Sequence, residues 1–581
     1  MNQFKYNKIW LVGILLTIFF ALLQPIRAQN TLNVDLTPTG SFSGQVQLSG
    51  QSVHSGVYIF IEGTSYVGVS DAAGNYVISG VPYGTYTLKA QKDGYSVAQT
   101  SGLTISSAGQ VVNVPLMTLN AVETAEHIFT LGTQYYTRGQ DSEAITEFTR
   151  LIDSYPGDPL AIEGEYRIAF IHYTQDDFVQ AQTDFNDFIA KHASSDLLPL
   201  AYYWLGKTKY NLEDYNGAIQ EYNKVVTNTP TNPKAADAQY SIGRTYQKQG
   251  LYNDAITAYQ KVIDNYPGSS RAADAQYSIG SLYLKLDQYA NAVAAFDKVV
   301  TNYAGNNIVI DAQFMKGYSY YKDSRYNNAI AEFNKVLTNY PASDRAADAQ
   351  YYKAYSYYSL ENYTTAANEF QSVINNYPAS DKLVLAQYYK AFSYYNQSEF
   401  DQALTEFIKV TTDHPGSDKQ IASLYYAANC KYESESYSYT QAITDYQNIV
   451  TNYPSSDYAA QAQYKIGRSH YQMENFAQAI TEFNKVMSNY SSSQKVPNAH
   501  FWKGFSYYYQ ADYANAISVW QTFVGLTTAN KEAGVAWYYI GRSYEKSGDN
   551  TNARTAYNKV INDYPNCNKF NDAQDRLANL P

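Results

Sequence analysis

Histidines, cysteines and acidic residues are the side chains in this chain whose chemistry suits catalysis or metal binding. No two histidines have the H-E-x-x-H spacing of a zinc-binding helix, and no Cys-x-x-Cys pair occurs. A G-x-S-x-G elbow, a Walker loop and a G-x-G-x-x-G dinucleotide fingerprint are also absent from the sequence. We therefore expect a protein that is not an enzyme, with no cofactor and no metal.

Aspartates instead recur in a fixed register, at Asp237, Asp274, Asp311 and Asp348. A residue copied at equal intervals is more typical of a charge near a helix start, where it favours the helix dipole, than of a catalytic acid. Cys430 and Cys567 are the only cysteines. In an extended array these two cysteines would lie too far apart to form a disulfide. We therefore expect both of them to be small structural residues.

Tyrosine is the residue type that stands out, with 62 tyrosines against 24 phenylalanines and 5 tryptophans. Many fall in trios with i, i+4, i+7 spacing, which places the three side chains on one side of a helix. The trios begin with Tyr240/Arg244/Gln247, where the middle residue is cationic. The candidate partner-binding residues from these trios are Tyr240, Arg244, Tyr318, Tyr321, Tyr351, Tyr355, Tyr358, Tyr388, Phe392, Tyr395, Arg468 and Phe505.

Two interpretations of these trios stay open. The first and third positions are regularly aromatic, which favours packing between neighbouring helices. The middle position varies, and Tyr318, Tyr355 and Phe392 would form a continuous apolar patch in mid-array. Exposed patches of this kind are often binding sites, and interfaces favour Tyr and Arg.

The trios lie in a sequence repeat, which is visible as one alanine that recurs at intervals of 37 residues. It occupies Ala144, Ala181, Ala218, Ala255, Ala292, Ala329, Ala366, Ala403, Ala442, Ala479, Ala516 and Ala553. The interval from Ala403 to Ala442 is 39, and we place the two extra residues within Glu433–Tyr439, between two helices. Such a period predicts a solenoid of about twelve helix pairs over residues 121–581. The segment Phe570–Leu580 is expected to cap it.

The unit from Ala235 to Pro267 resembles a tetratricopeptide repeat. The resemblance rests on the small, aromatic, apolar and proline positions Gly243, Tyr246, Ala255, Tyr259, Val262 and Pro267. It implies a mostly α fold, a right-handed superhelix of helix pairs whose first helices line a concave groove that binds peptides. The long loops are similar to those of bacterial envelope proteins of this type, such as the outer-membrane assembly lipoprotein.

The N-terminus has the order of a secretory signal peptide over residues 1–28. Lys5 and Lys8 precede an apolar run from Ile9 to Leu23, and Ala28 is the expected cleavage point. An uncleaved membrane anchor is the alternative, although the run is short for a membrane span. The residue directly after Ala28 is not a cysteine, so a lipoprotein anchor is not indicated, and no second long apolar segment predicts a transmembrane helix.

Residues 33–118 have a β pattern, with short alternating runs separated by glycine-containing turns. The expected strands are Ser43–Leu48, Val57–Glu62, Tyr66–Ser70, Tyr76–Ser79, Tyr86–Gln91 and Val111–Pro115. The Asp71…Gly74 turn and the Val81-Pro82-x-Gly84-x-Tyr86 segment resemble the carboxypeptidase regulatory-like domain. This resemblance implies a small, non-catalytic, transthyretin-like β-sandwich.

The sequence therefore predicts an exported scaffold in the bacterial periplasm or on the cell surface. With 42 Lys and Arg against 53 Asp and Glu, its formal net charge is −11, which is not the charge of a nucleic-acid-binding protein. We expect a protein or peptide partner in the cell envelope, bound through the solenoid. A glycan-binding or adhesin-like surface protein is the alternative, because tyrosine rings also stack on sugars.

Overall fold

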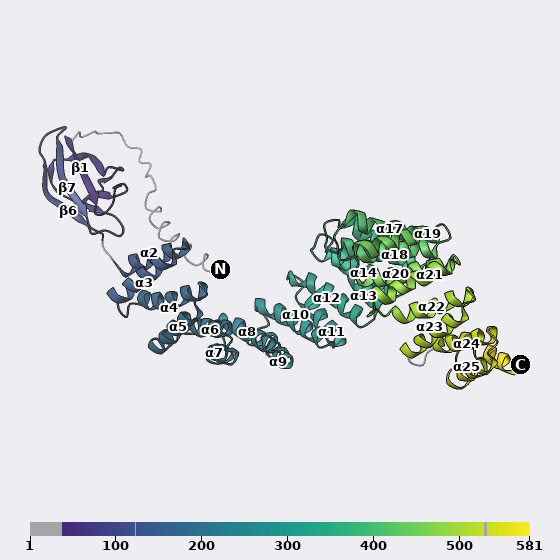
Figure 1. The fold of residues 1–581 in the computed structure, drawn as a ribbon. Coiled ribbons are helices and arrows are strands. Elements are labelled where there is room, and N and C mark those ends of the chain that lie inside the picture. Colours follow the sequence, from purple (N-terminus) through teal and green to yellow (C-terminus); the bar gives the residue numbers. More distant parts are fainter. Residues whose placement is uncertain (1–37, 122–123, 528–530) are drawn as a thin grey trace. The chain divides into compact units, whose positions relative to one another are not determined.

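The computed structural model describes residues 38–121, 124–527 and 531–581. The signal peptide predicted over residues 1–28 lies outside these ranges. By its contacts the chain divides into two compact units, one ending at Thr208 and the other beginning at Lys209. The fold is mostly helical, with a small two-sheet β domain ahead of paired helices (Figure 1).

Seven strands form the β domain. They are β1 (Thr39–Leu48), β2 (Tyr58–Ile61), β3 (Val67–Val69), β4 (Asn75–Pro82), β5 (Gly84–Gln91), β6 (Ala98–Ile105) and β7 (Val111–Leu119). One sheet has the order β4-β1-β7, with β1 antiparallel to β4 and parallel to β7. The other is antiparallel, with the order β3-β2-β5-β6. The predicted β-sandwich is confirmed, but β6 was not among the strands expected from the sequence.

Alternating side chains of the two sheets form the core of this domain. Phe42, Ile59 and Leu88 are fully buried there, and Phe42 meets Tyr86 edge-to-face with ring centroids 5.9 Å apart. The turn between β3 and β4 depends on Gly74, whose φ is +88°. A Cβ at this position would lie 2.0 Å from the carbonyl oxygen of Val46, so only glycine fits.

Helices alternate between a first and a second helix along the rest of the described chain. The first helices are α2 (Ala125–Thr137), α4 (Pro159–Thr174), α6 (Leu198–Asn211), α8 (Lys234–Lys248), α10 (Ser270–Lys285), α12 (Ile308–Lys322), α14 (Ala346–Ser359), α16 (Leu383–Asn396), α18 (Gln420–Glu433), α20 (Asp457–Gln472), α22 (Val496–Tyr509) and α24 (Lys531–Lys546). The second helices are α3 (Asp141–Ser154), α5 (Phe178–Lys191), α7 (Tyr215–Asn228), α9 (Tyr252–Asn265), α11 (Tyr289–Asn302), α13 (Tyr326–Asn339), α15 (Tyr363–Asn376), α17 (Phe400–Asp413), α19 (Tyr439–Asn452), α21 (Phe476–Asn489), α23 (Tyr513–Leu526) and α25 (Asn550–Asp563). A last helix, α26 (Phe570–Ala578), packs against α25.

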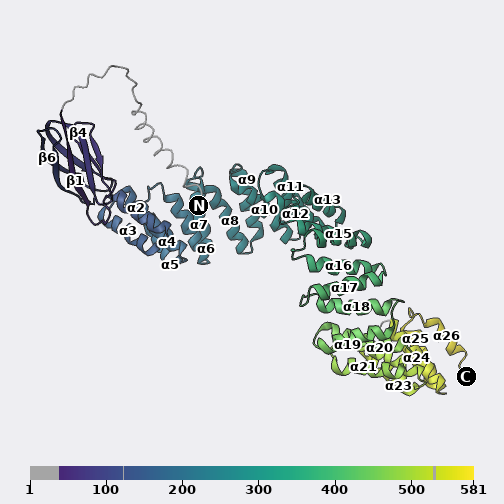
Figure 2. The ribbon, with the colours of Figure 1, turned by 90° about the horizontal axis from the view of Figure 1, so that it is seen from above.

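Small residues let the two helices of a repeat approach each other closely. Ala255 and Tyr259 on α9 are fully buried, and a Cβ at Gly243 of α8 would lie 2.6 Å from the Tyr259 ring. From α7 to α26 each helix also packs against the next one along the chain, as Figure 2 shows for α15 to α18. The repeat positions predicted from the alanine register are therefore core positions.

Every turn from a first to a second helix, except the longer one between α18 and α19, contains one residue in the left-handed region. It is Gly250 in one repeat, with φ +78°, but Glu361 and Ala511 elsewhere, with φ of +59° and +62°. A residue with a Cβ is strained in this conformation, so these turns cost stability wherever glycine is absent. The longer connection predicted within Glu433–Tyr439 is confirmed, since α18 ends at Glu433 and α19 begins at Tyr439.

Candidate functional site

The middle residues of the predicted trios form an aromatic ladder that links successive repeats. Tyr318, Tyr355 and Phe392 are half-buried on α12, α14 and α16. Each ring meets, edge-to-face, an aromatic ring on the first helix of the next repeat. The pairs are Tyr318–Tyr352 at 5.1 Å, Tyr355–Tyr389 at 4.7 Å and Phe392–Tyr426 at 4.5 Å between centroids. We call these six residues the aromatic ladder.

The ladder changes how the predicted patch should be interpreted. From the sequence, packing was favoured for the first and third trio positions, and the middle position was the candidate for an exposed binding patch. In the structure the middle rings also pack between repeats, so only part of each ring faces solvent. Their partners Tyr352, Tyr389 and Tyr426 were not singled out. The sequence does contain a pattern that could have identified these partners, because an aromatic residue stands 34 positions after each of the three middle rings.

The first and third trio positions also contact their surroundings. Tyr351 and Tyr388 are buried, and Tyr240 is half-buried. The third-position rings Tyr321, Tyr358 and Tyr395 meet the first aromatic residue of the following second helix, at centroid distances of 5.8, 5.3 and 5.4 Å. Burial raises the pKa of all five of these mid-array tyrosines, so their hydroxyls remain protonated hydrogen-bonding groups.

The remaining candidates differ from one another in exposure. Arg244 is exposed, with its guanidinium carbon 6.0 Å from the Tyr210 ring centroid. Arg468 stacks on Trp502, with its guanidinium carbon 3.6 Å from the ring centroid. Phe505 is buried, and its centroid lies 4.7 Å from that of Tyr539. Of these three, Arg244 is the most accessible to a partner.

The recurring aspartates form ion pairs between successive repeats. Arg271 at the start of α10 contacts Asp237 of α8 at 2.7 Å and Asp274 of its own helix at 3.1 Å. Arg345 makes the same pair of contacts with Asp311 and Asp348, at 2.5 and 3.4 Å. Asp237 and Asp311 therefore each tie their own first helix to the next one.

A second polar contact recurs between the two helices of a repeat, where a buried glutamate pairs with a lysine. Glu406 of α17 accepts hydrogen bonds from Gln387 and lies 2.8 Å from Lys390 and 2.9 Å from Lys409. Burial alone would raise the pKa of Glu406, but the two lysines outweigh it and the pKa lies below its usual value. This carboxylate is ionised and paired, which is a structural arrangement.

Other reactive groups do not converge. In the described ranges no three His, Cys, Asp or Glu side chains are placed to hold a metal ion. The Nδ1 atom of His172 shares a hydrogen bond with the Oδ2 atom of Asp184, 2.6 Å away. Cys430 and Cys567 are free and buried, and burial raises the pKa of Cys430 to about 12, so it is not a reactive thiol.

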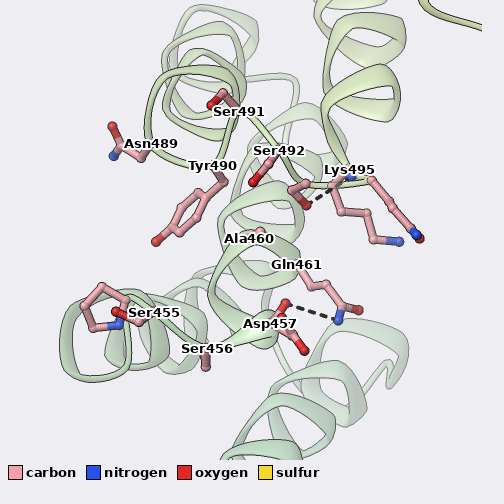
Figure 3. Close-up of a pocket in the computed structure, with 13 residues that line it drawn as sticks. Ser455, Ser456, Asp457, Ala460, Gln461, Asn489, Tyr490, Ser491, Ser492 and Lys495 are labelled. Atoms are coloured by element: carbon pink, nitrogen blue, oxygen red, sulfur yellow. Dashed lines mark hydrogen bonds between the residues drawn. The ribbon is translucent and has the colours of Figure 1, made fainter.

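A polar depression of ≈ 820 Å³ lies at the connections before α20 and α22. Its walls are the loops Pro454–Asp457 and Asn489–Lys495, with Ala460 and Gln461 of α20 between them (Figure 3). Serine hydroxyls and the Tyr490 ring face it. The second loop has Ser491 where other repeats have proline.

Comparisons with protein families match most of the chain. The model described as YfiO, outer membrane lipoprotein, matches residues 122–214, 310–467 and 460–581, which together exceed half of the chain. Tetratricopeptide repeat models match residues 200–232 and 240–307. The carboxypeptidase regulatory-like domain matches residues 41–119. No curated protein matches the chain.

Several solved structures match parts of the chain at low identity and with low TM-scores. A tetratricopeptide repeat protein from Parabacteroides merdae is 17% identical, with a TM-score of 0.30, covering 46% of this chain and 98% of that one. The C-terminal part of a repeat protein from Cytophaga hutchinsonii is 20% identical, with a TM-score of 0.37, covering 45% and 99%. MamA from Desulfovibrio magneticus is 19% identical, with a TM-score of 0.27, covering 32% and 98%.

No helix within the described ranges is both long and apolar enough to cross a membrane.

The family assignment rests on the sequence models and on the paired helices, which agree over the repeats. The chain belongs to the YfiO outer membrane lipoprotein family, with tetratricopeptide repeats behind an N-terminal carboxypeptidase regulatory-like domain.

Proposed function

We propose that this protein is an exported, non-enzymatic scaffold of the bacterial cell envelope that binds a protein or peptide through its first helices. The observation that carries this proposal is the aromatic ladder, which presents partly exposed tyrosine edges across successive repeats. Tyrosine is favoured at interfaces because its ring supplies apolar area and its hydroxyl supplies a hydrogen bond.

The surroundings of the ladder favour a peptide over a charged ligand. At the helix starts Asp311 pairs with Arg345, and Asp348 pairs with Arg345 and Lys382, so two carboxylates meet two cations. The ladder itself has no charged side chain. An extended segment crossing the ladder would meet rings and hydroxyls in turn. The envelope location is supported by the family described as an outer membrane lipoprotein. Whether this is the periplasm or the outer surface is tested by protease accessibility in intact cells.

The test is affinity capture of partners from native envelope with a triple variant, Tyr318→Leu, Tyr355→Leu and Phe392→Leu. Leucine keeps an apolar contact between repeats but removes each ring and, at the two tyrosines, the hydroxyl. The control introduces leucine at exposed positions of the second helices in the same three repeats, at Thr338, Asn375 and Thr412. We expect the ladder variant to lose a partner that the control retains. Equal capture by both, with both folded by circular dichroism, would refute the proposal.

The polar depression beside Tyr490 favours a second candidate, glycan binding. Serine hydroxyls, Asn489 and Gln461 are groups that hydrogen-bond sugar hydroxyls, and an aromatic ring supplies a stacking surface. Sedimentation with purified peptidoglycan separates the two candidates. Under the glycan hypothesis Tyr490→Ala reduces co-sedimentation while the ladder variant does not.

A further inference from the structure

Three cations gather on α20 and at the start of α22. Arg468 stacks on Trp502, and its Nη1 donates to the Tyr464 hydroxyl at 3.4 Å. Its Nε is buried and has no hydrogen-bond partner among the described residues. Lys495 Nζ lies 5.8 Å from the Tyr464 ring centroid. In the part of the chain that the structure describes, no carboxylate lies within 4.0 Å of Arg468 or Lys495.

Lys465 completes this cluster. Its Nζ lies 3.3 Å from Glu433 and 4.0 Å from the Tyr432 ring centroid. Burial lowers the pKa of Lys465, the positive charges of Arg468 and Lys495 act in the same direction, and Glu433 opposes them. Three positive charges therefore lie near two carboxylates, Glu433 and Asp457, the latter in the lining of the adjoining depression. The excess is one positive charge, in a chain whose net charge is −11.

Other repeats show what is missing here. Lys495 occupies the position of Arg271, which contacts Asp237 and Asp274. In the repeats of α20 and α22 those two aspartate positions are taken by Gln461 and Asn498. The cation of the inter-repeat pair is kept and both of its acids are replaced by neutral amides, so the acids of that pair do not neutralise Lys495.

We propose that the Lys465–Arg468–Lys495 cluster binds a carboxylate of an acidic peptide segment. Arginine offers a planar fork of donors that suits a carboxylate, and an arginine already stacked on an aromatic ring loses little freedom on binding. The polar depression opens beside the cluster, since Lys495 and Gln461 line it (Figure 3). This inference extends the proposed peptide-binding role, and it names the chemistry of one subsite.

The probe is a fluorescein-labelled hexaglutamate peptide, with hexaglutamine as the uncharged comparison, titrated with the full chain at low ionic strength and followed by anisotropy. The test variant is Arg468→Gln with Lys495→Gln. The control is Lys261→Gln with Lys322→Gln, which removes the same charge at two exposed lysines. We expect the test variant to weaken hexaglutamate binding at least about tenfold, the lower range for a charge-assisted hydrogen bond, and the control to change it less than about twofold.

Two results would overturn the inference. One is hexaglutamate binding that falls equally in both variants, which would indicate non-specific attraction. The other is displacement of the peptide by inorganic phosphate at concentrations where acetate has no effect, which would indicate a phosphate site. A Trp502→Phe variant supplies a second readout, because carboxylate binding at Arg468 should change Trp502 fluorescence. The ladder variant is scored separately, so failure of this subsite is distinguishable from failure of the proposed scaffold function.

Discussion

The aromatic ladder predicts a measurable coupling energy between Tyr355 and Tyr389. Their ring centroids are 4.7 Å apart with an interplanar angle of 83°, which is the edge-to-face geometry that aromatic pairs prefer. Such a pair contributes about 0.5–1.5 kcal/mol beyond its buried area. Burial, together with a hydrogen bond to Tyr389, also raises the pKa of the Tyr355 hydroxyl. The two rings should therefore stabilise the junction of α14 and α16 as a unit.

A double-mutant cycle isolates this coupling. Tyr355→Leu and Tyr389→Leu are each expected to cost about 1–2 kcal/mol, because half-buried rings lose less than the 3–5 kcal/mol of fully buried ones. The double variant should cost less than the sum by about 0.5–1.5 kcal/mol. Local opening free energies come from hydrogen exchange of peptides covering α14 to α16, since repeat arrays open locally.

The matched control is the same cycle at Ser281 and Met315, which occupy the equivalent positions two repeats earlier but are not aromatic. We expect a coupling below about 0.3 kcal/mol there, the error expected of additive sites. If the Tyr355–Tyr389 coupling is no larger than that of the control, the rings do not form a ladder. The reasoning about the first-helix face would then fail as well.

Three further predictions follow from the backbone, the buried ion pairs and the thiols. Gly250 and Ala511 both have positive φ, a conformation that glycine adopts without strain. Gly250→Ala should therefore destabilise the chain by about 1 kcal/mol, and Ala511→Gly should stabilise it by up to about 1 kcal/mol. Thermal unfolding measures both changes. Glu406→Gln should destabilise the chain at pH 7, where Lys390 loses its carboxylate partner, and the difference from wild type should shrink below about pH 4.5. The sign follows from the lowered pKa of Glu406, whose stabilisation is present above its unfolded pKa and is lost as the pH falls through the folded one. Urea midpoints at several pH values test this, and a constant difference would contradict it. Cys430 should resist a thiol reagent at pH 8 in the native chain and react on unfolding, because burial raises its pKa to about 12.

The helices were predictable because the repeat makes the pattern redundant. One alanine register and one aromatic position, copied along the chain, fix which residues face the core, as Ala255 and Tyr259 do. Strand β6 was missed because Ala98–Ile105 contains Gly102 and several hydroxyl residues, and only its end alternates clearly. It pairs with β5, a contact that local periodicity does not report.

The candidate site was predictable only in part. The trio spacing correctly placed Tyr318, Tyr355 and Phe392 on one face, but not their burial, because their partners lie on the next repeat. The inter-repeat pairing of Arg271 with Asp237 likewise spans 34 residues. Contacts of this kind depend on how repeats stack, and a helical pattern within one repeat does not contain that information.

The central claim is that a partner binds the first-helix face, and photo-crosslinking in living cells tests it most directly. A benzophenone amino acid is placed at Arg244 and at Tyr355 on first helices. The matched positions are Lys261 and Asn368, which are exposed on the second helices of the same repeats. We predict a protein adduct from the first-helix positions and none from the second-helix positions. Adducts that form only from the second helices, or equally from both, would contradict the account.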